Sequence, residues 1–457
     1  MTLRAPRRPL KEALAPALAL VLAAGSVLPP ATAGASPEAL ARNWPAWRGP
    51  LATGVAPQAD PPIELGHPRH LKWKTAIPGR GTASPVVWED QVFVLTAVPA
   101  GAAGSRPPAA PAEGGGGRGM TEAPSEPQRF VLLALDRQTG RVRWEKTARQ
   151  QMPHEGHHQD HGFASASAVT DGEVVIAHFN SYGTYAYDLS GRLLWEKDLG
   201  DMRTRNGFGE GSSPALHGET VVLLWDHEGE DFLVALDRRT GRELWRQARE
   251  EPTGWSTPLV VDSPGGPVVV VNGTHRVRAY DLQSGEPRWE CAGQTVNAIP
   301  SPVPGHGRVY VMSGYRGAAL QAITLGRQGN LSGTDAIAWS HARNTPYVPS
   351  PLLYGDRLYF FAGNNATLSV FQATDGRPLV DAQRLEGMYG VYASPVGAAG
   401  RVYVAGRDGS VWVLKDGPGL EVLAKAKFEE GFDASPAAVG RQLLLRGRQH
   451  LYCLAPE

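Results

Sequence analysis

The sequence predicts an all-β protein, an eight-bladed β-propeller whose blades are four-stranded antiparallel sheets. Two recurring features of the 457-residue chain support this prediction. One is a unit of the form A-x-D-x-x-T-G-x-x-x-W, and the other is a small residue followed by proline just before an apolar strand. A repeat of some 44 residues with four short strands is typical of a propeller blade.

The first unit is a strand, a tight turn and a second strand. An alternating apolar run leads to Asp136, which can accept hydrogen bonds from turn amides, and Gly140 tolerates the positive φ that such a turn needs. Trp144 then falls on the following strand, where its ring can fill the space between packed sheets. The unit occurs at 134–144, 235–245 and 279–289, and one residue shorter at 186–195.

The second feature marks eight blade starts: Ser84, Ser167, Ser213, Thr257, Ser301, Ser350, Ser394 and Ser435. The fourth strands of the blades also number eight. Six are marked by a tryptophan, the first of them Trp73, and in the last two a valine, Val380 or Val422, takes its place. Trp73 precedes the first start, and the last repeat stops after its third strand. We therefore expect residues 71–77 to supply the missing fourth strand of the last blade, which closes the ring and removes a bare sheet edge.

The domain organisation follows from composition. Residues 1–33 read as a secretory signal with a basic start, an apolar run and an A-x-A cleavage site, so we expect a periplasmic or secreted protein. Sec-type export fits better than twin-arginine export, and cleavage fits better than a membrane anchor. Residues 34–70 predict an extended arm, 71–457 the propeller, and 99–128 a disordered loop insertion rich in Gly, Ala and Pro.

Charge and cysteine content exclude several classes of function. Lysine plus arginine and aspartate plus glutamate both total 45, so nothing favours nucleic acid as a partner. Cys291 and Cys453 are the two cysteines, and we expect both as unpaired buried thiols. We expect a monomer.

The repeated unit in an eight-bladed ring resembles the pyrroloquinoline quinone (PQQ)-like propeller repeat. That superfamily includes quinoprotein alcohol dehydrogenases and the outer-membrane assembly factor BamB. The closest resemblance is to exported bacterial PQQ-binding-like β-propeller repeat proteins, which share the W-P-x-W-R-G-P segment found at Trp44 to Pro50. The resemblance implies a fold more clearly than a function.

Unusual residues gather on one face of the predicted ring. Strands of a blade alternate in direction, so the loops that lead into the first strands emerge beside the loops between the second and third strands. We call this side the loop face, and we expect a protein or small-molecule ligand there. The residues on the loops leading into the first strands include Arg80, His154 to His161, Glu210, Trp255, Asn297, Tyr347, Tyr389 and Asp433; those on the other loops include 226–231, Tyr315, Arg316 and Arg407.

The segment H-E-G-H-H-Q-D-H is the strongest local signal. Its four imidazoles, His154, His157, His158 and His161, could hold Zn or Cu. The spacing matches no fixed metal motif, so a histidine-rich loop without a metal is the favoured interpretation. The acidic segment 226–231 could bind Ca²⁺, but a solvated hairpin tip is favoured.

The resemblance also implies a possible quinoprotein site. PQQ needs an aromatic ring against its plane, a cation at its carbonyl and a carboxylate base. Against this function, no two cysteines are adjacent, although such dehydrogenases typically place a Cys-Cys pair over the quinone. The favoured interpretation is structural: Trp255 packs between blades and Glu210 pairs with an arginine. For the quinoprotein function, the resemblance implies a set of site residues. These are Trp255 to stack on the quinone, Arg80 or Arg316 to polarise its carbonyl, Glu210 and Asn297 to bind Ca²⁺, and Asp433 as the base.

Three hypotheses about function follow. The first is an exported, non-catalytic propeller that binds a ligand or a protein through its loop face. The second is a PQQ-dependent oxidoreductase acting on alcohols or sugars, and the third is a BamB-like scaffold for outer-membrane assembly. No cysteine lies near the cleavage site to carry a lipid, which argues against the third.

Overall fold

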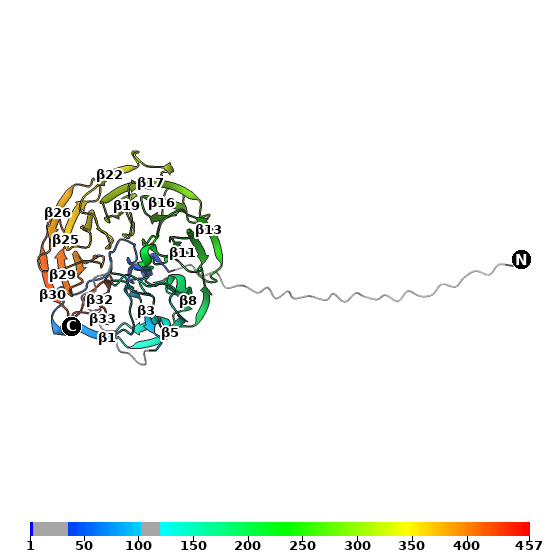
Figure 1. Ribbon diagram of the computed structural model, residues 1–457, viewed down its shortest axis with the longest axis horizontal. Helices are drawn as coiled ribbons and strands as arrows, with labels where there is room; N and C mark the ends of the chain where they lie inside the picture. The colour runs from blue at the N-terminus through cyan, green and yellow to red at the C-terminus, as the bar shows by residue number, and fades with distance from the viewer. Residues whose placement is uncertain (3–34, 102–118) are drawn as a thin grey trace. The chain divides into compact units, whose positions relative to one another are not determined.

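The computed structural model describes residues 1–2, 35–101 and 119–457. The signal segment expected at 1–33 therefore lies outside the described residues, apart from the first two. The described strands form eight sheets arranged as the blades of a ring, and the chain passes around the ring once (Figure 1). The predicted eight-bladed propeller is confirmed. None of the helices in the described ranges is long and apolar enough to cross a membrane.

The strands of each blade pair in chain order from the axis outward. The first four blades are β2 (Val86–Trp88), β3 (Gln91–Pro99), β4 (Gln128–Asp136) and β5 (Val142–Gln151); β6 (Val169–Thr170), β7 (Val174–His178), β8 (Thr184–Asp188) and β9 (Leu193–Lys197); β10 (Ala215–His217), β11 (Thr220–Trp225), β12 (Phe232–Asp237) and β13 (Glu243–Ala248); and β14 (Leu259–Val261), β15 (Val268–Asn272), β16 (Arg276–Asp281) and β17 (Pro287–Ala292).

The next three blades repeat this pattern. They are β18 (Val303–Gly305), β19 (Arg308–Ser313), β20 (Ala319–Thr324) and β22 (Ile337–His341); β23 (Leu352–Tyr354), β24 (Arg357–Phe361), β25 (Thr367–Gln372) and β26 (Pro378–Arg384); and β27 (Val396–Ala398), β28 (Arg401–Ala405), β29 (Ser410–Lys415) and β30 (Val422–Lys427). One sheet departs from the prediction, because the two-residue β21 (Gly329–Asn330) joins the fourth blade as a fifth strand, parallel to β17.

The eighth blade combines the two ends of the ring. It contains β31 (Ala437–Val439), β32 (Gln442–Arg446), β33 (His450–Leu454) and, as its outermost strand, β1 (Leu71–Ala76). β1 runs antiparallel to β33, with Trp73 opposite Cys453 (Figure 1). The predicted closure is confirmed. Cys291 and Cys453 are buried and unpaired, also as expected.

The tryptophan unit links neighbouring blades. Asp136 Oδ1 accepts from the amides of Gln138 and Thr139, at 3.0 and 2.8 Å, and so fixes the turn. Gly140 has a φ of 71°, and the ring of Trp73 from the preceding blade lies against it. A Cβ atom at Gly140 would lie 2.5 Å from that ring. Trp73 Nε1 also donates to the carbonyl of Arg137, 2.9 Å away, so this turn holds the indole of the preceding blade.

The arm is less extended than expected. It contains α1 (Pro37–Ala41), which Ser36 caps, and the 3₁₀ segment η1 (Pro68–His70). Further 3₁₀ segments, η2 (Asn180–Tyr182) and η3 (Arg205–Gly207), lie in propeller loops. Trp44 is fully buried and pairs with Val87 near the turn between β2 and β3. The arm therefore lies at the turn end of the first strands, opposite the loop face.

The described ends of the 99–128 insertion make backbone contacts with the propeller. Pro99 pairs with Gln128 at the end of the β3–β4 ladder. Met120 forms a bridge with His158, and the Thr121 amide donates to the carbonyl of His157, at 2.9 Å. Backbone pairing holds these ends without the apolar side chains that the prediction required. Residues 102–118 lie outside the described part of the chain.

A closed ring of hydrogen bonds joins all eight blades at the axis. The backbone N–H of each blade-start residue donates to the side-chain hydroxyl of the corresponding residue in the next blade. The last bond runs from Ser435 N to Ser84 Oγ and completes the circle. All eight lie between 2.9 and 3.1 Å, through Ser84, Ser167, Ser213, Thr257, Ser301, Ser350, Ser394 and Ser435.

Proline explains how the ring forms. Seven of these residues precede a proline, which restricts the residue before it to extended backbone conformations. An extended residue at the axis points its N–H along the ring rather than into a local turn. Its hydroxyl is the nearest acceptor for the preceding blade.

We expect Ser301→Ala to lower the free energy of unfolding by about 1–3 kcal/mol, because it leaves the buried Thr257 N–H without an acceptor. Urea unfolding at neutral pH measures this change. Thr257→Ser is the matched control, since it keeps the hydroxyl that accepts from Ser213 and should cost less than about 1 kcal/mol. Equal losses in the two variants would show that the ring contributes little to stability.

Candidate functional site

A cavity opens on the axis at the loop face, directly above the hydroxyl ring. Its volume is about 440 Å³. The residue two positions before each ring hydroxyl lines it, because alternate residues of an extended segment point the same way. These eight are Thr82, Ser165, Gly211, Trp255, Ile299, Val348, Tyr392 and Asp433.

The arm supplies the base of this cavity. Trp47 is half-buried and lines both this cavity and a second one on the arm side of the ring. Its Nε1 donates to Ser435 Oγ, at 3.2 Å, so the indole is held against the ring. Trp47 therefore separates the two ends of the axial channel.

Aromatic side chains form much of the wall. The rings of Tyr315 and Tyr347 stack with centroids 4.8 Å apart. Trp255 is 9% exposed and lies beside Phe208, with centroids 6.3 Å apart, while its Nε1 donates to the carbonyl of Gly209 at 2.7 Å. Trp255 thus faces the cavity. The interpretation favoured from the sequence, in which Trp255 only packs between blades, did not include this exposure to the cavity.

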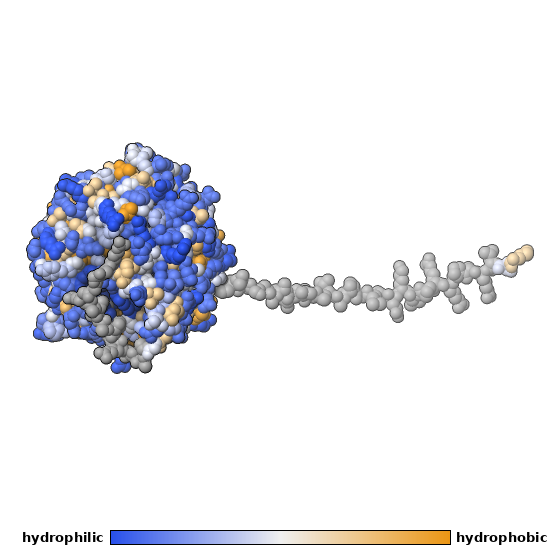
Figure 2. Space-filling view, in the orientation of Figure 1, coloured by the Kyte–Doolittle hydropathy of each residue, from blue (hydrophilic) through white to orange (hydrophobic). Residues whose placement is uncertain are grey.

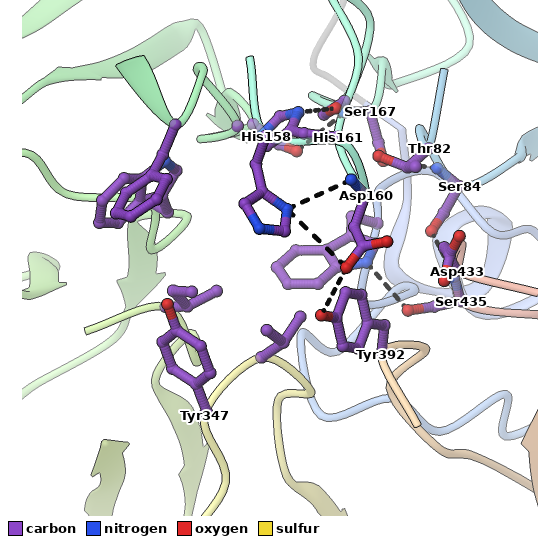
Figure 3. A pocket seen from close by; sticks show the side chains of 18 of the residues that line it. Thr82, Ser84, His158, Asp160, His161, Ser167, Tyr347, Tyr392, Asp433 and Ser435 are labelled. Atoms are coloured by element: carbon purple, nitrogen blue, oxygen red, sulfur yellow. Dashed lines mark hydrogen bonds and ion pairs between the residues drawn. The ribbon is translucent and has the colours of Figure 1, made fainter. Parts of the chain in front are cut away.

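A charged cluster around Arg407 closes one side of the cavity, and Figure 3 shows its members Asp160, Tyr392 and Asp433. Arg407 donates through Nε to Asp433 Oδ1 and through an amino group to Asp160 Oδ1, both at 2.6 Å. The Tyr392 ring lies 3.9 Å from the guanidinium, and its hydroxyl donates to Asp160 Oδ2 at 3.2 Å. Burial would lower the pKa of Arg407, but the charge of Asp433 and the hydrogen bond to Asp160 raise it.

Asp433 is consequently held in place by its ion-pair contacts. Its second oxygen faces Arg448, at 3.6 Å, so both oxygens are directed at guanidinium groups. A general base needs a lone pair directed at its substrate. The role as a base that the quinoprotein hypothesis gave to Asp433 has little geometric support.

The four histidines point to different partners. His158 and His161 line the cavity (Figure 3), whereas His157 is buried and its Nδ1 lies 2.7 Å from the carbonyl of His158. Burial lowers the pKa of His161 to about 4, so this imidazole is neutral at pH 7. His154 lies apart, with Nε2 2.6 Å from the carbonyl of Met202.

One group of described residues has metal-like geometry, and it differs from the predicted set. Ligand atoms of His154, Glu155 and Glu210 lie within 4.8 Å of one another. The carboxylates already have partners: Glu155 accepts from Thr204, and Glu210 accepts from the amide and hydroxyl of Ser181. The group is therefore a hydrogen-bonded network whose atoms could also approach a cation. No arginine pairs with Glu210 among its described contacts, contrary to our expectation.

The remaining predicted residues lie outside the central cavity. Asn297 and Arg316 line a neighbouring cavity of about 240 Å³, and Glu210 lines another of about 10 Å³. Arg80 donates to the carbonyl of Gln159. Burial lowers the pKa of Arg80, against the opposing charge of Asp433.

These positions test the fit of PQQ, an anionic quinone with three carboxylates. Within residues 35–101 and 119–457, the side chains that line the central cavity include no lysine or arginine. Its aspartates are already paired with arginines behind the wall. The two residues implied as Ca²⁺ ligands, Glu210 and Asn297, line separate cavities. The site residues therefore do not fit PQQ with Ca²⁺, although Trp255 presents the aromatic surface that was expected.

The acidic segment 226–231 is exposed at its tip, residues 228–230, as the sequence favoured, but its two ends are buried. Asp226 is 1% exposed and pairs with Arg249, with Nε 2.7 Å from Oδ1. Asp231 accepts from the amides of His227 and Glu251. These carboxylates fold inward because buried partners satisfy them, and they leave no open set of calcium ligands.

Sequence reasoning missed several of the lining residues. Tyr392 and Trp47 were not proposed for the site, and Asp160 was noted only as part of the histidine-rich segment. Tyr392 could have been found, because it stands two residues before Ser394 as Trp255 stands before Thr257. The contact of Asp160 with Arg407 joins residues 247 positions apart, and no periodic signal marks it.

The buried carboxyl of Glu210 predicts a pH-dependent stability. Burial raises its pKa to about 7, and the hydrogen bonds from Ser181 oppose this rise only in part. The folded state then holds a proton that the unfolded state has lost, so stability falls as pH rises from about 4.5 to about 7. Glu210→Gln cannot ionise. We expect it to match the wild type near pH 4.5 and to exceed it at pH 8 by up to about 3 kcal/mol.

Thermal unfolding of the two proteins at matched pH values measures this difference. A variant that is equally destabilised at both pH values would show that Glu210 is ionised throughout, or that its charge is required by a bound cation.

Comparisons with known proteins agree with this fold. A methanol dehydrogenase described as europium-containing superposes with a TM-score of 0.61 at 11% identity, over 91% of this chain and 98% of that one. The quinohemoprotein alcohol dehydrogenase of Comamonas testosteroni gives 0.59 at 11%, over 91% and 80%. BamB of Moraxella catarrhalis gives 0.50 at 15%, over 73% and 96%. These identities support the fold alone.

No curated protein sequence matches the chain significantly. A family model described as outer membrane protein assembly factor BamB matches residues 69–230 and 229–457, which together span the whole propeller. The PQQ-like propeller resemblance is thereby confirmed, and the chain belongs to the BamB family.

Proposed function

We propose that this chain is an exported, non-catalytic binding module that takes a small uncharged ligand into the cavity on its loop face. The observation that carries the proposal is the cavity itself. It has a volume of about 440 Å³, aromatic walls and a base closed by Trp47. Concave sites of this size with a few convergent polar groups are where small ligands bind.

The chemistry of the lining favours a ligand with both flat apolar faces and hydroxyl groups, such as a sugar. Trp255, Tyr315 and Tyr347 offer ring faces for C–H surfaces. The ring hydroxyls already accept one amide hydrogen bond each but retain a proton to donate. The neutral His161 imidazole adds a further polar contact.

Two alternatives remain as rivals. A PQQ-dependent oxidoreductase would have to place three carboxylates in a cavity whose described lining has no lysine or arginine. A BamB-like assembly scaffold would bind protein across a broader surface. The face of the ring in Figure 2 is predominantly hydrophilic, with scattered small apolar groups, which favours small-ligand recognition on that face.

Intrinsic tryptophan fluorescence tests the proposal, because Trp47 and Trp255 both line the cavity. We would titrate the mature form with neutral monosaccharides, disaccharides and polyols, and separately with PQQ plus Ca²⁺. We expect a saturable change with at least one neutral compound. Trp255→Ala should weaken that binding by about tenfold or more, the effect of losing about 1–2 kcal/mol of stacking. Trp245→Phe, on the outer strand of the third blade, is the control and should bind normally.

The opposite outcome would favour the enzyme. Stoichiometric retention of PQQ after desalting, together with dye reduction by alcohols that Trp255→Ala abolishes, would overturn the proposal. Saturable binding that Trp255→Ala leaves unchanged would place the ligand elsewhere on the protein.

A further inference from the structure

The arm pairs with the inner strands of four blades. The amide of Val87 donates to Trp44 and its carbonyl accepts from Trp44, at 2.8 and 3.0 Å. Gly397 makes the same two bonds, with Gly54 and Ala56, at 2.9 and 2.8 Å. Thr170 donates to Pro45 and Leu353 donates to Thr53. The arm thus covers blades one, two, six and seven, and it adds a bond to Gly440 in the eighth.

These contacts follow one register. Val87, Gly397 and Leu353 are the middle residues of their three-residue strands. In each strand the residue on either side bonds to the second strand of the blade, so the N–H and C=O of the middle residue point toward the axis. All three are buried under the arm.

Blades three to five lack this cover. Between Pro45 and Thr53 the arm turns toward the axis at Trp47. Its described backbone forms no hydrogen bond with the inner strands of these three blades. The middle residues of their inner strands are Leu216, Val260 and Pro304. No backbone partner among the described residues meets the axial N–H or C=O of Leu216 or Val260. Both side chains are half-buried.

A groove lies over these three strands. Its volume is about 530 Å³, and the arm residues 45–52 form its opposite wall. The lining is largely apolar and includes Leu40, Leu51, Leu216 and Val260. Leu51 is 51% exposed, so its side chain is open to a partner in the groove.

We propose that this groove binds an extended segment of a partner polypeptide, which pairs with Leu216 and Val260 as the arm pairs with the other blades. The groove is continuous with the arm interface at both ends, where Pro45 bonds to Thr170 and Thr53 bonds to Leu353. The arm advances by one residue from the first blade to the second, Trp44 to Pro45, and by two from the sixth to the seventh, Thr53 to Val55. A partner segment of about three to six residues would therefore cover blades three to five.

The segment's composition follows from the groove. Its side chains toward Leu40 and Leu51 would be small or apolar, as Thr53 to Ala56 are in the arm. Its backbone would supply acceptors for the N–H groups of Leu216 and Val260. Pro304 has no N–H, so the fifth blade offers only its carbonyl. The groove is a separate site from the cavity proposed for the loop face, because Trp47 lies between the two.

The probe is a fluorescein-labelled peptide with the sequence of residues 50–59, P-L-A-T-G-V-A-P-Q-A, which contains the segment that pairs with blades six and seven. Fluorescence polarisation with the full chain should show saturable binding with a Kd below about 1 mM. Val260→Pro removes the axial N–H and should weaken binding by about tenfold. Val260→Ala keeps the N–H and should weaken it by no more than about threefold. Equal effects of the two substitutions would overturn backbone pairing.

Hydrogen–deuterium exchange of the wild type keeps the proposal testable if Val260→Pro fails to fold. We expect the amides of Leu216 and Val260 to exchange at least 100-fold faster than those of Val87 and Gly397, and the peptide to slow them. Slow exchange in the free chain that becomes fast when residues 1–34 are removed would assign the groove to the chain's own N-terminal segment. Protection that grows with protein concentration, with a dimer in light scattering, would assign it to a second copy. Either result, or a lack of protection by the peptide, overturns the proposal.

Discussion

The ring of eight hydrogen bonds between blade-start residues is the constraint on which the rest of the structure depends. Each bond runs from a backbone N–H to a hydroxyl of the next blade, so the ring closes only if every blade contributes one residue at the same height. A blade that slipped along the axis would break two bonds and leave buried polar groups unpaired, which is costly. The ring therefore sets the radius of the channel and aligns the loops above it.

The site is a consequence of this alignment. Because the backbone is extended before each hydroxyl, the residue two positions earlier faces the same axis in every blade. The repeat fixes the place of these side chains but leaves their identity free. Trp255, Tyr392 and Asp433 occupy equivalent positions with unrelated chemistry. A propeller of this kind can therefore change the side chains around its cavity at eight positions without disturbing the ring. The ring hydroxyls lie two residues further along the chain, and the prolines three.

Much of the fold was predictable because its signals are periodic. Trp73 and Leu454 together indicated how the ring closes, and the strand pairing confirms it. The site was predictable only in part. Trp255 and Asp433 were proposed from residue type, and both line the cavity, but the rule that also selects Tyr392 and Val348 needs the geometry of the extended segment.

The rest of the site depends on contacts that no repeat encodes. Arg407 and Asp160 come from different blades, and their pairing turns a possible cation for a ligand into an internal ion pair. Trp47 enters the channel from the arm, whose composition gave no sign of an axial side chain. Glu210 turned out to bond to Ser181, because a buried hydroxyl and amide were closer than any arginine. Such pairings are decided by packing between distant segments.

Trp47 also connects the two ends of the molecule. It is held by Ser435 of the hydroxyl ring and lies in the wall of both cavities, so it is the shared boundary of the loop-face site and the groove under the arm. A ligand that only touched the indole would leave the arm unchanged, because Trp44 and Thr53 are anchored by backbone bonds on either side. A ligand that displaced the indole would have to move the arm between those anchors, and this is the part of the arm that walls the groove. The two sites can therefore be coupled only by ligands that reach the base of the cavity. Ligands that bind higher, against Tyr315 and Tyr347, would leave the groove as it is.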